Sequence, residues 1–560
     1  MQLNGSQIIM ECLLEQGVDT VFGYPGGTVI NIFDALYEYR DRLRHILTSH
    51  EQGATHAADG YARSTGKTGV VIATSGPGAT NTVTGIATAH MDSIPLVVIT
   101  GNVALPLLGK DSFQEVDIVG VTMPITKHSF IVKDVNKIAE TIRRAFYIAN
   151  DGRPGPVLVD IPKDLSVAMA EYSPEQPRVI EKHDDISEAS LNNAMEILEK
   201  SKNPFVLTGG GVIRAEAGAE ALEFVEKMNS PFSSTLMGLG GINTGHQLFT
   251  GMIGMHGSKT SNMASTQCDL LVAIGSRFSD RVISNVKGFA PDAAILHIDV
   301  DPAEVNKNVQ AIHHVSGDVK VALKKINERL KPIHETERQT WVNQVQAWKK
   351  EFPLDTNQNG KIKPHTILRK LSELTSGKAI ITTEVGQSQM WAAQYYTHSE
   401  PRTFLTSGGL GTMGFGFGAC MGVALGRPDK KPINIAGDGS FLMNCNELAT
   451  AVHYKLPMLT IILDNGVLGM VRQWQDLFFD KRFSGTTIER NTDFVKLAEA
   501  FGAKGYRLDK VEDVEAVLKE ALKQEGPVVV HVPIDKDDKV FPMVPPGAFI
   551  KDLIMDETLN

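Results

Sequence analysis

The residues best placed to do chemistry are Asp438 and Asn465, because each follows a short apolar run typical of a buried strand. Asp438 lies in GDGS, directly after PINIA, and Asn465 ends LTIILDN, 27 residues further on. Parallel strands end at one edge of a sheet, so both side chains are expected at the carboxyl edge, where α/β sheets bind ligands. A carboxylate and an amide oxygen are hard ligands that suit Mg²⁺, which completes its shell with phosphate oxygens. The glycines beside Asp438 let a diphosphate approach the backbone.

Taken singly, these residues and several other short motifs have simpler explanations. Asp438 alone could belong to an Asp-Gly turn, and Asn465 alone could cap a helix, but the two together at two strand ends favour the metal site. The segment GKT (66–68) lacks the first glycine of a phosphate-binding P-loop and precedes a strand, so nucleotide hydrolysis is not expected. The run GGG (209–211) follows a strand and opens a helix, but Arg214 replaces the third glycine of a dinucleotide fingerprint. That run can still place backbone N–H groups near a phosphate.

The elements that must position these residues fall into three parts, roughly 1–165, 190–330 and 365–560. Each part alternates short Val/Ile-rich runs with longer amphipathic stretches, the pattern of βα units around a mostly parallel sheet. Residues 166–190 and 331–364 lack this periodicity and are predicted to be linkers. The first and third parts share strand, glycine turn, helix with Ala-Thr-Ala, proline and strand in the same order. We predict an α/β protein of three domains, the first and third related and the middle one Rossmann-like.

Composition and charge exclude several classes of function. The 560 residues are 42% hydrophobic and 21% charged, with a net charge of −10. An acidic chain without a basic run is not expected to bind nucleic acid or an anionic membrane. The most apolar stretch is broken by prolines and too short to cross a membrane, and no basic secretory leader precedes it. Four cysteines without a CxxC pair argue against a zinc site or disulfides, which favours a cytoplasmic enzyme.

The sequence also resembles a known family. GDGS with its downstream Asn is similar to the thiamin diphosphate motif, and the whole chain resembles the catalytic subunits of acetohydroxyacid (acetolactate) synthases. The motifs that carry this resemblance are FGYPGG (22–27), SHEQGATHAADGYAR (49–63), SGPGATN (75–81), FQE (113–115), GRPGPVLVDIPKD (152–164), GMHG (254–257), GSRFSDR (275–281), SGGLGTMGFG (407–416), GMVRQWQ (469–475) and MVPPGA (543–548). The resemblance implies a homodimer or dimer of dimers, with a small regulatory subunit and with thiamin diphosphate, Mg²⁺ and FAD as cofactors.

The resemblance implies that the enzyme decarboxylates pyruvate and joins the product to a second pyruvate or to 2-oxobutanoate. Glu51 is implied to hydrogen-bond N1′ of the cofactor's aminopyrimidine in the partner subunit's site, and Met413 to hold the cofactor bent. The implied thiamin diphosphate contacts are Pro25, Glu51, Gly76, Asn81, Val385, Gln387, Ser388, Gly411, Met413, Gly437, Gly439, Ser440, Leu468 and Gly469. The implied Mg²⁺ ligands are Asp438, Asn465 and the backbone carbonyl of Val467.

On the substrate side the resemblance implies Gly27, Phe113, Gln114, Lys163, Arg281, Met470 and Trp474. The planar fork of Arg281 suits the carboxylate of the second keto acid. For the aromatic residues Phe113 and Trp474, packing in the core is the alternative role. The implied FAD contacts are Arg153, Gly209, Gly210, Gly211, Thr235, Leu236, Met237, Met255, His256, Gly275, Ser276, Arg277, Asp299 and Asp318. Because the carbon–carbon bond formation transfers no net electrons, the flavin is expected to be structural.

Two alternatives stay open at the level of the sequence. A pyruvate oxidase or a 2-keto acid decarboxylase would use the same thiamin cofactor, and would be recognised by consumption of an electron acceptor or by release of aldehyde. A scaffold that had kept the fold without catalysis would be indicated by replacement of Glu51, Asp438 or Asn465. All three residues are present.

Overall fold

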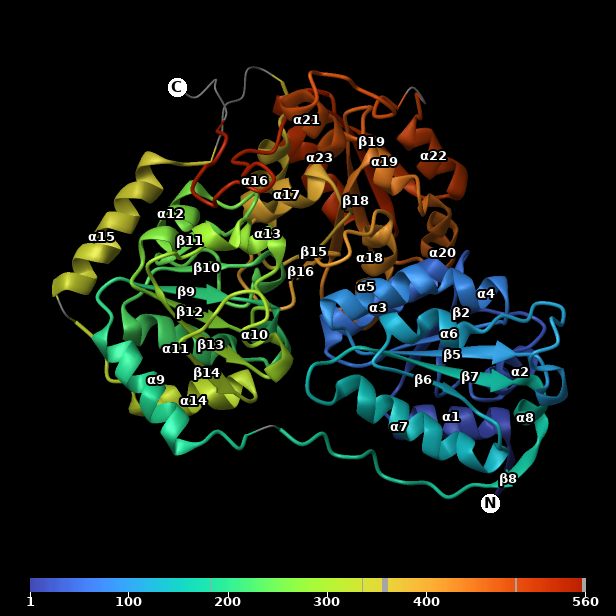
Figure 1. The fold of residues 1–560 in the computed structure, drawn as a ribbon. Coiled ribbons are helices and arrows are strands. Elements are labelled where there is room, and N and C mark those ends of the chain that lie inside the picture. Colours follow the sequence, from blue (N-terminus) through green and yellow to red (C-terminus); the bar gives the residue numbers. More distant parts are fainter. Residues whose placement is uncertain (183, 335, 355–360, 489–490, 556–560) are drawn as a thin grey trace.

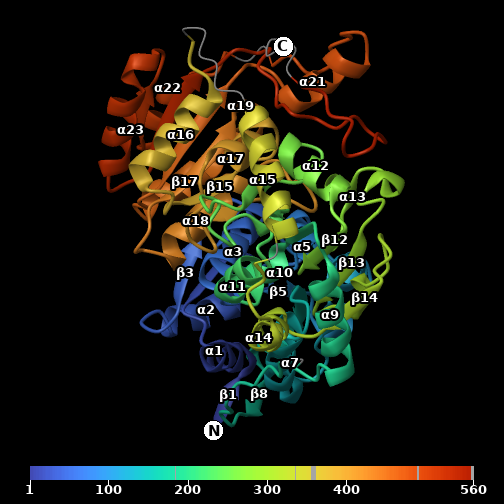
Figure 2. The ribbon, with the colours of Figure 1, turned by 90° about the vertical axis from the view of Figure 1, so that its left-hand side faces the viewer.

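The structure is a computed structural model that describes residues 1–182, 184–334, 336–354, 361–488 and 491–555. The described residues form three α/β domains, each around a six-stranded sheet of parallel strands. In Figure 1 the third domain lies above the first, and the middle domain lies beside both. The view turned by 90° in Figure 2 again places the third domain above the first. The predicted α/β class with mostly parallel sheets is confirmed.

The first domain has the strand order β3-β2-β4-β5-β7-β6. Its strands are β2 (Thr20–Tyr24), β3 (Arg44–Leu47), β4 (Gly69–Ala73), β5 (Leu96–Asn102), β6 (His128–Ile131) and β7 (Pro156–Pro162). Its helices are α1 (Gly5–Glu15), α2 (Ile30–Glu38), α3 (Glu51–Thr65), α4 (Pro77–Asn81), α5 (Val83–Asp92), α6 (Ile118–Thr122), α7 (Ile138–Asn150) and α8 (Lys163–Val167). A short antiparallel pair, β1 (Gln2–Asn4) and β8 (Met169–Glu171), closes the domain. Strands β5 and β7 are buried throughout, which explains their largely apolar sequences.

The third domain has the strand order β16-β15-β17-β18-β20-β19. Its strands are β15 (Ile380–Thr383), β16 (Phe404–Leu405), β17 (Pro432–Gly437), β18 (Leu459–Asp464), β19 (Lys504–Arg507) and β20 (Val528–Pro533). Its helices are α16 (Pro364–Thr375), α17 (Gln387–Tyr395), α18 (Phe415–Gly426), α19 (Asp438–Phe441), α20 (Leu448–His453), α21 (Gly469–Phe478), α22 (Phe494–Phe501) and α23 (Val514–Lys523). Numbered along the chain, the strands of the first and third sheets both lie in the order 2-1-3-4-6-5. The predicted relation between these two domains is therefore confirmed.

The middle domain has a different order, β11-β10-β9-β12-β13-β14, which is 3-2-1-4-5-6 along the chain. This is the strand order of a Rossmann fold, as predicted. The strands are β9 (Pro204–Thr208), β10 (Phe232–Ser234), β11 (Phe249–Met252), β12 (Leu270–Ile274), β13 (Ala294–Asp299) and β14 (His313–Ser316). The helices are α9 (Glu188–Lys200), α10 (Gly210–Arg214), α11 (Gly218–Met228), α12 (Lys259–Gln267), α13 (Asp280–Ile283), α14 (Val319–Arg329) and α15 (Thr336–Glu351).

The prediction that residues 331–364 form a linker is wrong for the part that forms α15. The rings of Trp341 and Trp348 pack edge to face, 5.7 Å apart, and lie with Val345 in a core cluster of the middle domain. Spacings of four and three residues put these side chains on one helix face, so the segment has the periodicity of a docked helix. Residues 355–360 of the predicted linker lie outside the described residues.

The first and third domains are joined by close packing of α3 on α18. A Cβ at Gly422 would lie 1.9 Å from the carbonyl oxygen of Ala57, and a Cβ at Gly60 would lie 2.2 Å from that of Ala419. Glycine at these crossing points removes the side chain that would hold the helices apart. The packing fixes α3, which begins at Glu51, against the third domain.

Candidate active site

Asp438 and Asn465 lie together at the carboxyl edge of the third sheet. Asp438 follows β17 and Asn465 follows β18, two neighbouring parallel strands in which Gly437 pairs with Leu463. Asp438 is 4% exposed, and both residues line a cavity of about 70 Å³. The fold thus produces the adjacency expected from the two strand ends.

Many of the predicted thiamin diphosphate contacts line the same small cavity. They come from the start of α17, the segment before α18, the GDGS turn and the start of α21: Val385, Gln387, Ser388, Met413, Gly437, Gly439, Ser440, Leu468 and Gly469, with the predicted metal ligand Val467. Gly386, Trp391, Leu463 and Val471 also line it and were not predicted. Gly386 has a φ of 141° and follows β15 at the same sheet edge as Asp438, so its place after a strand was a usable signal. The other three carry no such local signal.

The side chains of this cavity fit a diphosphate-bound Mg²⁺ ion. Burial, with a smaller contribution from the nearby Asp464 carboxylate, raises the pKa of Asp438 to about 7. A cation beside Asp438 would relieve this unfavourable burial of charge. In the described part of the chain, no three His, Cys, Asp or Glu side chains are grouped to hold a metal ion. One carboxylate, one amide and one backbone carbonyl leave coordination positions for phosphate oxygens, which is how Mg²⁺ is commonly bound.

Glu51 is the first residue of α3 and is held from two sides. Asn81 donates Nδ2 to Glu51 Oε2 at 3.0 Å. Glu447 of the third domain accepts the backbone N–H of His50 at 3.0 Å and that of Ser49 at 3.1 Å, which fixes the start of the helix. Glu51 is 8% exposed. Glu51 is not one of the described residues that line the small cavity of the same chain.

The predicted substrate residues of the first domain, and two of its predicted thiamin diphosphate contacts (Pro25 and Gly76), follow strands at the carboxyl edge of its sheet. Pro25 and Gly27 follow β2, Gly76 follows β4 and Lys163 follows β7, and each of the four strands β2, β4, β5 and β7 runs parallel to its neighbour. Phe113 and Gln114 lie on the loop after β5; a Cβ at Gly76 would lie 3.0 Å from Gln114 Cα. Phe113 is 88% exposed, so core packing does not explain it.

A second, larger cavity of about 1380 Å³ lies between the three domains. It is lined by the predicted FAD contacts Arg153, Gly210, Gly211, Thr235, Leu236, Met237, Met255, His256, Gly275, Ser276, Arg277, Asp299 and Asp318. Gly209 packs behind the wall, because a Cβ there would lie 2.1 Å from the Gly275 carbonyl oxygen. Arg281, Met470, Trp474 and Gly411 line the same cavity, so Trp474 is a wall residue and is only half-buried. Met470 and Val385 line both cavities.

The large cavity fits a nucleotide cofactor. The glycines 209–211 follow β9 and Gly275 follows β12, the two neighbouring strands at which the strand order reverses. Rossmann folds bind nucleotides at this switch point. Ser276 Oγ is buried and has no hydrogen-bond partner among the described residues, as expected for a group that meets a polar ligand. Arg153 donates Nη1 to Glu304 Oε1 at 2.6 Å and so joins the first domain to the middle one.

Comparison with known proteins agrees with this geometry. Models of thiamine pyrophosphate enzymes match residues 3–121 (N-terminal TPP binding domain), 191–326 (central domain) and 384–532 (C-terminal TPP binding domain). The chain is 45% identical over 552 residues to the acetolactate synthase isozyme 2 large subunit of Escherichia coli K12, covering 99% of both chains. It is 43% identical to a probable acetolactate synthase large subunit of Methanocaldococcus jannaschii (99% of this chain and 95% of the relative covered). It is 41% identical to the acetolactate synthase large subunit of Haemophilus influenzae (99% of both chains covered).

The chain belongs to the acetolactate synthase large-subunit family of thiamine pyrophosphate enzymes. None of the helices in the described part of this family member combines the length and the apolar character that a membrane crossing requires.

One buried carboxylate beside the small cavity of this acetolactate synthase family member was not predicted. Glu384 is fully buried and accepts hydrogen bonds from Ser440 Oγ at 2.7 Å, Gly414 N at 2.8 Å and Phe417 N at 3.0 Å. Burial raises the pKa of Glu384, and these donors oppose that rise. Glu384 thus ties the GDGS turn to the segment that carries Met413. In sequence Glu384 directly follows β15, and this position after a strand is the one local signal that could have identified it.

Proposed function

We propose that this chain is the catalytic subunit of an acetolactate synthase, a thiamin diphosphate-dependent transferase. The observation that carries the proposal is the small cavity at the carboxyl edge of the third sheet, which Asp438, Asn465 and Met413 line together. Relatives at 41–45% identity over nearly the whole chain support acetolactate synthase over a pyruvate oxidase or a 2-keto acid decarboxylase. The reaction would join two molecules of pyruvate, or pyruvate and 2-oxobutanoate.

The main residues of the proposed site would have distinct tasks. Bound thiamin diphosphate supplies the nucleophilic carbon that lets a 2-keto acid lose CO₂. Asp438, Asn465 and the Val467 carbonyl would hold Mg²⁺ on its diphosphate, and the glycine backbone beside Asp438 would bind phosphate oxygens. Glu51 would hold a proton at N1′ of the aminopyrimidine. Arg281, whose side chain is 63% exposed, would bind the carboxylate of the second keto acid with its planar fork.

The proposal includes an assembly of at least two chains. Glu51, Gly27 and Phe113 belong to the first domain, and among the described residues lining the small cavity none comes from that domain. A second copy that brought its first domain to the cavity would complete the site. A small regulatory subunit is also part of the proposal, because relatives of this chain are named large subunits. The assembly would be cytoplasmic.

The direct test is incubation of the purified protein with pyruvate, Mg²⁺ and thiamin diphosphate, followed by identification of the products. We expect CO₂ and 2-acetolactate without any electron acceptor. Acetaldehyde as the main product would instead assign a decarboxylase, and a strict need for oxygen or a quinone would assign an oxidase. Omitting Mg²⁺ after chelation is the matched control, and it should abolish product formation.

A second prediction concerns the large cavity. We expect the purified protein to be yellow and to release FAD on denaturation, because the cavity lies at the nucleotide-binding switch point of the middle domain. The flavin should keep its oxidised absorption spectrum during turnover with pyruvate, since no net electrons are transferred. A colourless preparation with full activity would contradict the assignment of the cavity.

A third prediction concerns the choice of the second substrate. Trp474 lines the large cavity with Met470 and is proposed to contact the alkyl tail of the incoming keto acid. 2-Oxobutanoate exceeds pyruvate by one methylene, and a methylene in an apolar pocket changes selectivity by about 10–200-fold. Trp474→Leu should therefore lower the ratio of acetohydroxybutyrate to acetolactate, measured by competition at fixed pyruvate with rising 2-oxobutanoate. Arg281→Lys is the contrasting variant: it should raise the requirement for both second substrates equally. A wild-type product ratio in Trp474→Leu would remove that residue from the pocket.

A further inference from the structure

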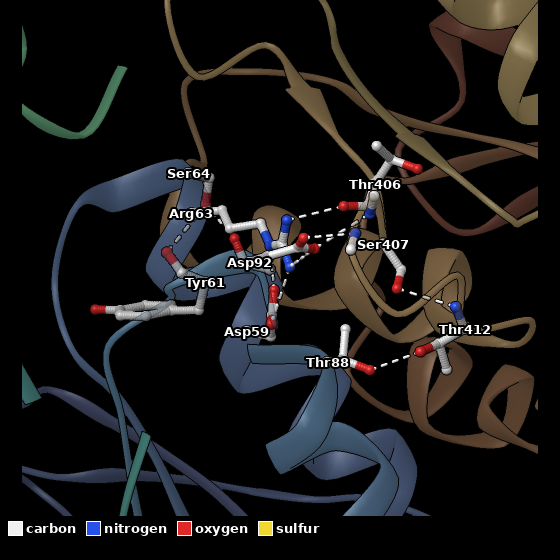
Figure 3. A network of polar contacts seen from close by, with 12 residues as sticks. Asp59, Tyr61, Arg63, Ser64, Thr88, Asp92, Thr406, Ser407 and Thr412 are labelled. Atoms are coloured by element: carbon white, nitrogen blue, oxygen red, sulfur yellow. Dashed lines mark hydrogen bonds and ion pairs between the residues drawn. The ribbon is translucent and has the colours of Figure 1, made fainter. Parts of the chain in front are cut away.

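A buried ion pair of the first domain lies against the glycine-rich segment 407–412 of the third (Figure 3). Arg63, in the last turn of α3, donates Nη2 to Asp92 Oδ2 at 2.9 Å and Nη1 to the carbonyl oxygen of Thr406 at 2.8 Å. Asp92 is the last residue of α5. The two side chains are 6% and 1% exposed. Charges buried this deeply are stable only when paired and hydrogen-bonded, so the geometry of the pair is tightly determined.

Asp92 binds the backbone of the segment directly. Its Oδ1 accepts the N–H of Gly409 at 2.7 Å, and its Oδ2 accepts the N–H of Gly408 at 3.2 Å. A Cβ at Gly409 would lie 2.8 Å from Asp92 Oδ1, so only glycine lets the backbone come this close. One carboxylate thus fixes two consecutive amides with charge-assisted hydrogen bonds.

Two further hydrogen bonds hold the end of the segment, next to the proposed cofactor cavity. Thr412 N donates to Ser407 Oγ at 3.0 Å, and the hydroxyls of Thr412 and Thr88 are 2.7 Å apart (Figure 3). Thr412 directly precedes Met413, which lines the small cavity with Asp438. Gly408, Gly409 and Gly411 line the large cavity. The segment therefore forms part of the wall between the two proposed cofactor sites.

We propose that Asp92, held in place by Arg63, is a positioning residue that sets the backbone of segment 407–412 and thereby the position of Met413 against bound thiamin diphosphate. The inference rests on the proposed function, because it concerns the cofactor of that function. Asp59 offers a matched comparison. Its carboxylate is also buried against Arg63, at 3.2 Å from Nη2, but in the described part of the chain it makes no hydrogen bond to the segment.

The experiment compares Asp92→Asn with Asp59→Asn in the full-length assembled protein. Each variant removes one carboxylate from Arg63, so both should lower the melting temperature of the apoprotein. Only Asp92→Asn replaces an acceptor of Gly408 or Gly409 with an NH₂ group that cannot accept. Its affinity for thiamin diphosphate at fixed Mg²⁺, measured by calorimetry, should fall ~10–100-fold, the usual effect of losing an outer-shell contact. Equal weakening in both variants, or none in Asp92→Asn, would overturn the proposal.

A second pair of variants, each of which removes only one hydroxyl, serves if Asp92→Asn does not fold. Ser407→Ala removes only the acceptor of Thr412 N, and Ser64→Ala removes a hydroxyl that donates to the carbonyl of Gly60 within α3. We expect weaker thiamin diphosphate binding in Ser407→Ala and wild-type binding in Ser64→Ala; identical affinities would overturn the proposal. If the wild-type protein itself fails to bind thiamin diphosphate with Mg²⁺, the proposed function is refuted, and the comparison of variants separates that outcome from failure of this inference.

Discussion

Replacing Glu51 with glutamine should lower turnover with pyruvate by at least ~100-fold, the scale of a lost acid–base group. Glutamine has nearly the same shape, and its amide oxygen can still accept the 3.0 Å hydrogen bond from Asn81. It has no carboxylate to exchange a proton with N1′. The fold, the melting temperature and the affinity for thiamin diphosphate should therefore change little, and exchange of the cofactor's C2 proton, followed by NMR after acid quench, should slow with turnover. Near-normal exchange would remove Glu51 from the mechanism.

Replacing Asp438 with asparagine should have opposite effects on binding and on stability. Mg²⁺-dependent binding of thiamin diphosphate should weaken at least ~100-fold, because the cation loses its only carboxylate ligand in the proposed site. Calorimetry at saturating Mg²⁺ measures this loss. Unchanged affinity would show that the GDGS turn does not hold the metal.

The same variant should stabilise the apoprotein. Burial raises the folded-state pKa of Asp438 from 3.8 to about 7, so the ionised carboxylate destabilises the fold increasingly as the pH rises from about 4 to 7. Asparagine carries no charge, and at pH 8 it should raise the free energy of unfolding by about 1–3 kcal/mol. The gain should vanish near pH 4, where Asp438 is protonated in the folded wild type. Asp464→Asn is the control for cofactor binding, because Asp464 is not one of the described residues that line the small cavity. The Asp464→Asn variant should bind thiamin diphosphate as the wild type does.

The two variants can be combined to test the shared site. In a mixed dimer of Glu51→Gln and Asp438→Asn chains, one of the two sites would join an intact Glu51 to an intact Asp438. Mixing two nearly inactive proteins under conditions of subunit exchange should therefore restore activity. If each chain carried its own complete site, every site in the mixture would stay defective and no activity would return.

The sequence alone determined the class of fold and the adjacency of Asp438 and Asn465, the two proposed side-chain ligands of Mg²⁺. The runs before Asp438 and Asn465 are largely apolar because β17 and β18 are buried along most of their length. Such strands can be predicted from local composition. The parallel direction then puts both strand ends at one edge, so the pairing of a carboxylate with an amide required no tertiary information. Edge strands such as β14 (HHVS) and β19 (KGYR) carry polar residues and give no such signal.

Only the tertiary structure decided how these elements meet. Strand order depends on pairings between segments far apart in the chain, so the shared 2-1-3-4-6-5 order of the outer domains appears only once the sheets are assembled. The structure assigns α15 as a helix, and Trp341 and Trp348 on that helix pack into a buried core cluster of the middle domain. The contact between Asp92 and Gly409 spans 317 residues, and no local pattern encodes such a distance. Buried carboxylates such as Asp92 and Glu384 are identified by the donors around them, and a sequence does not specify those donors until the chain has folded.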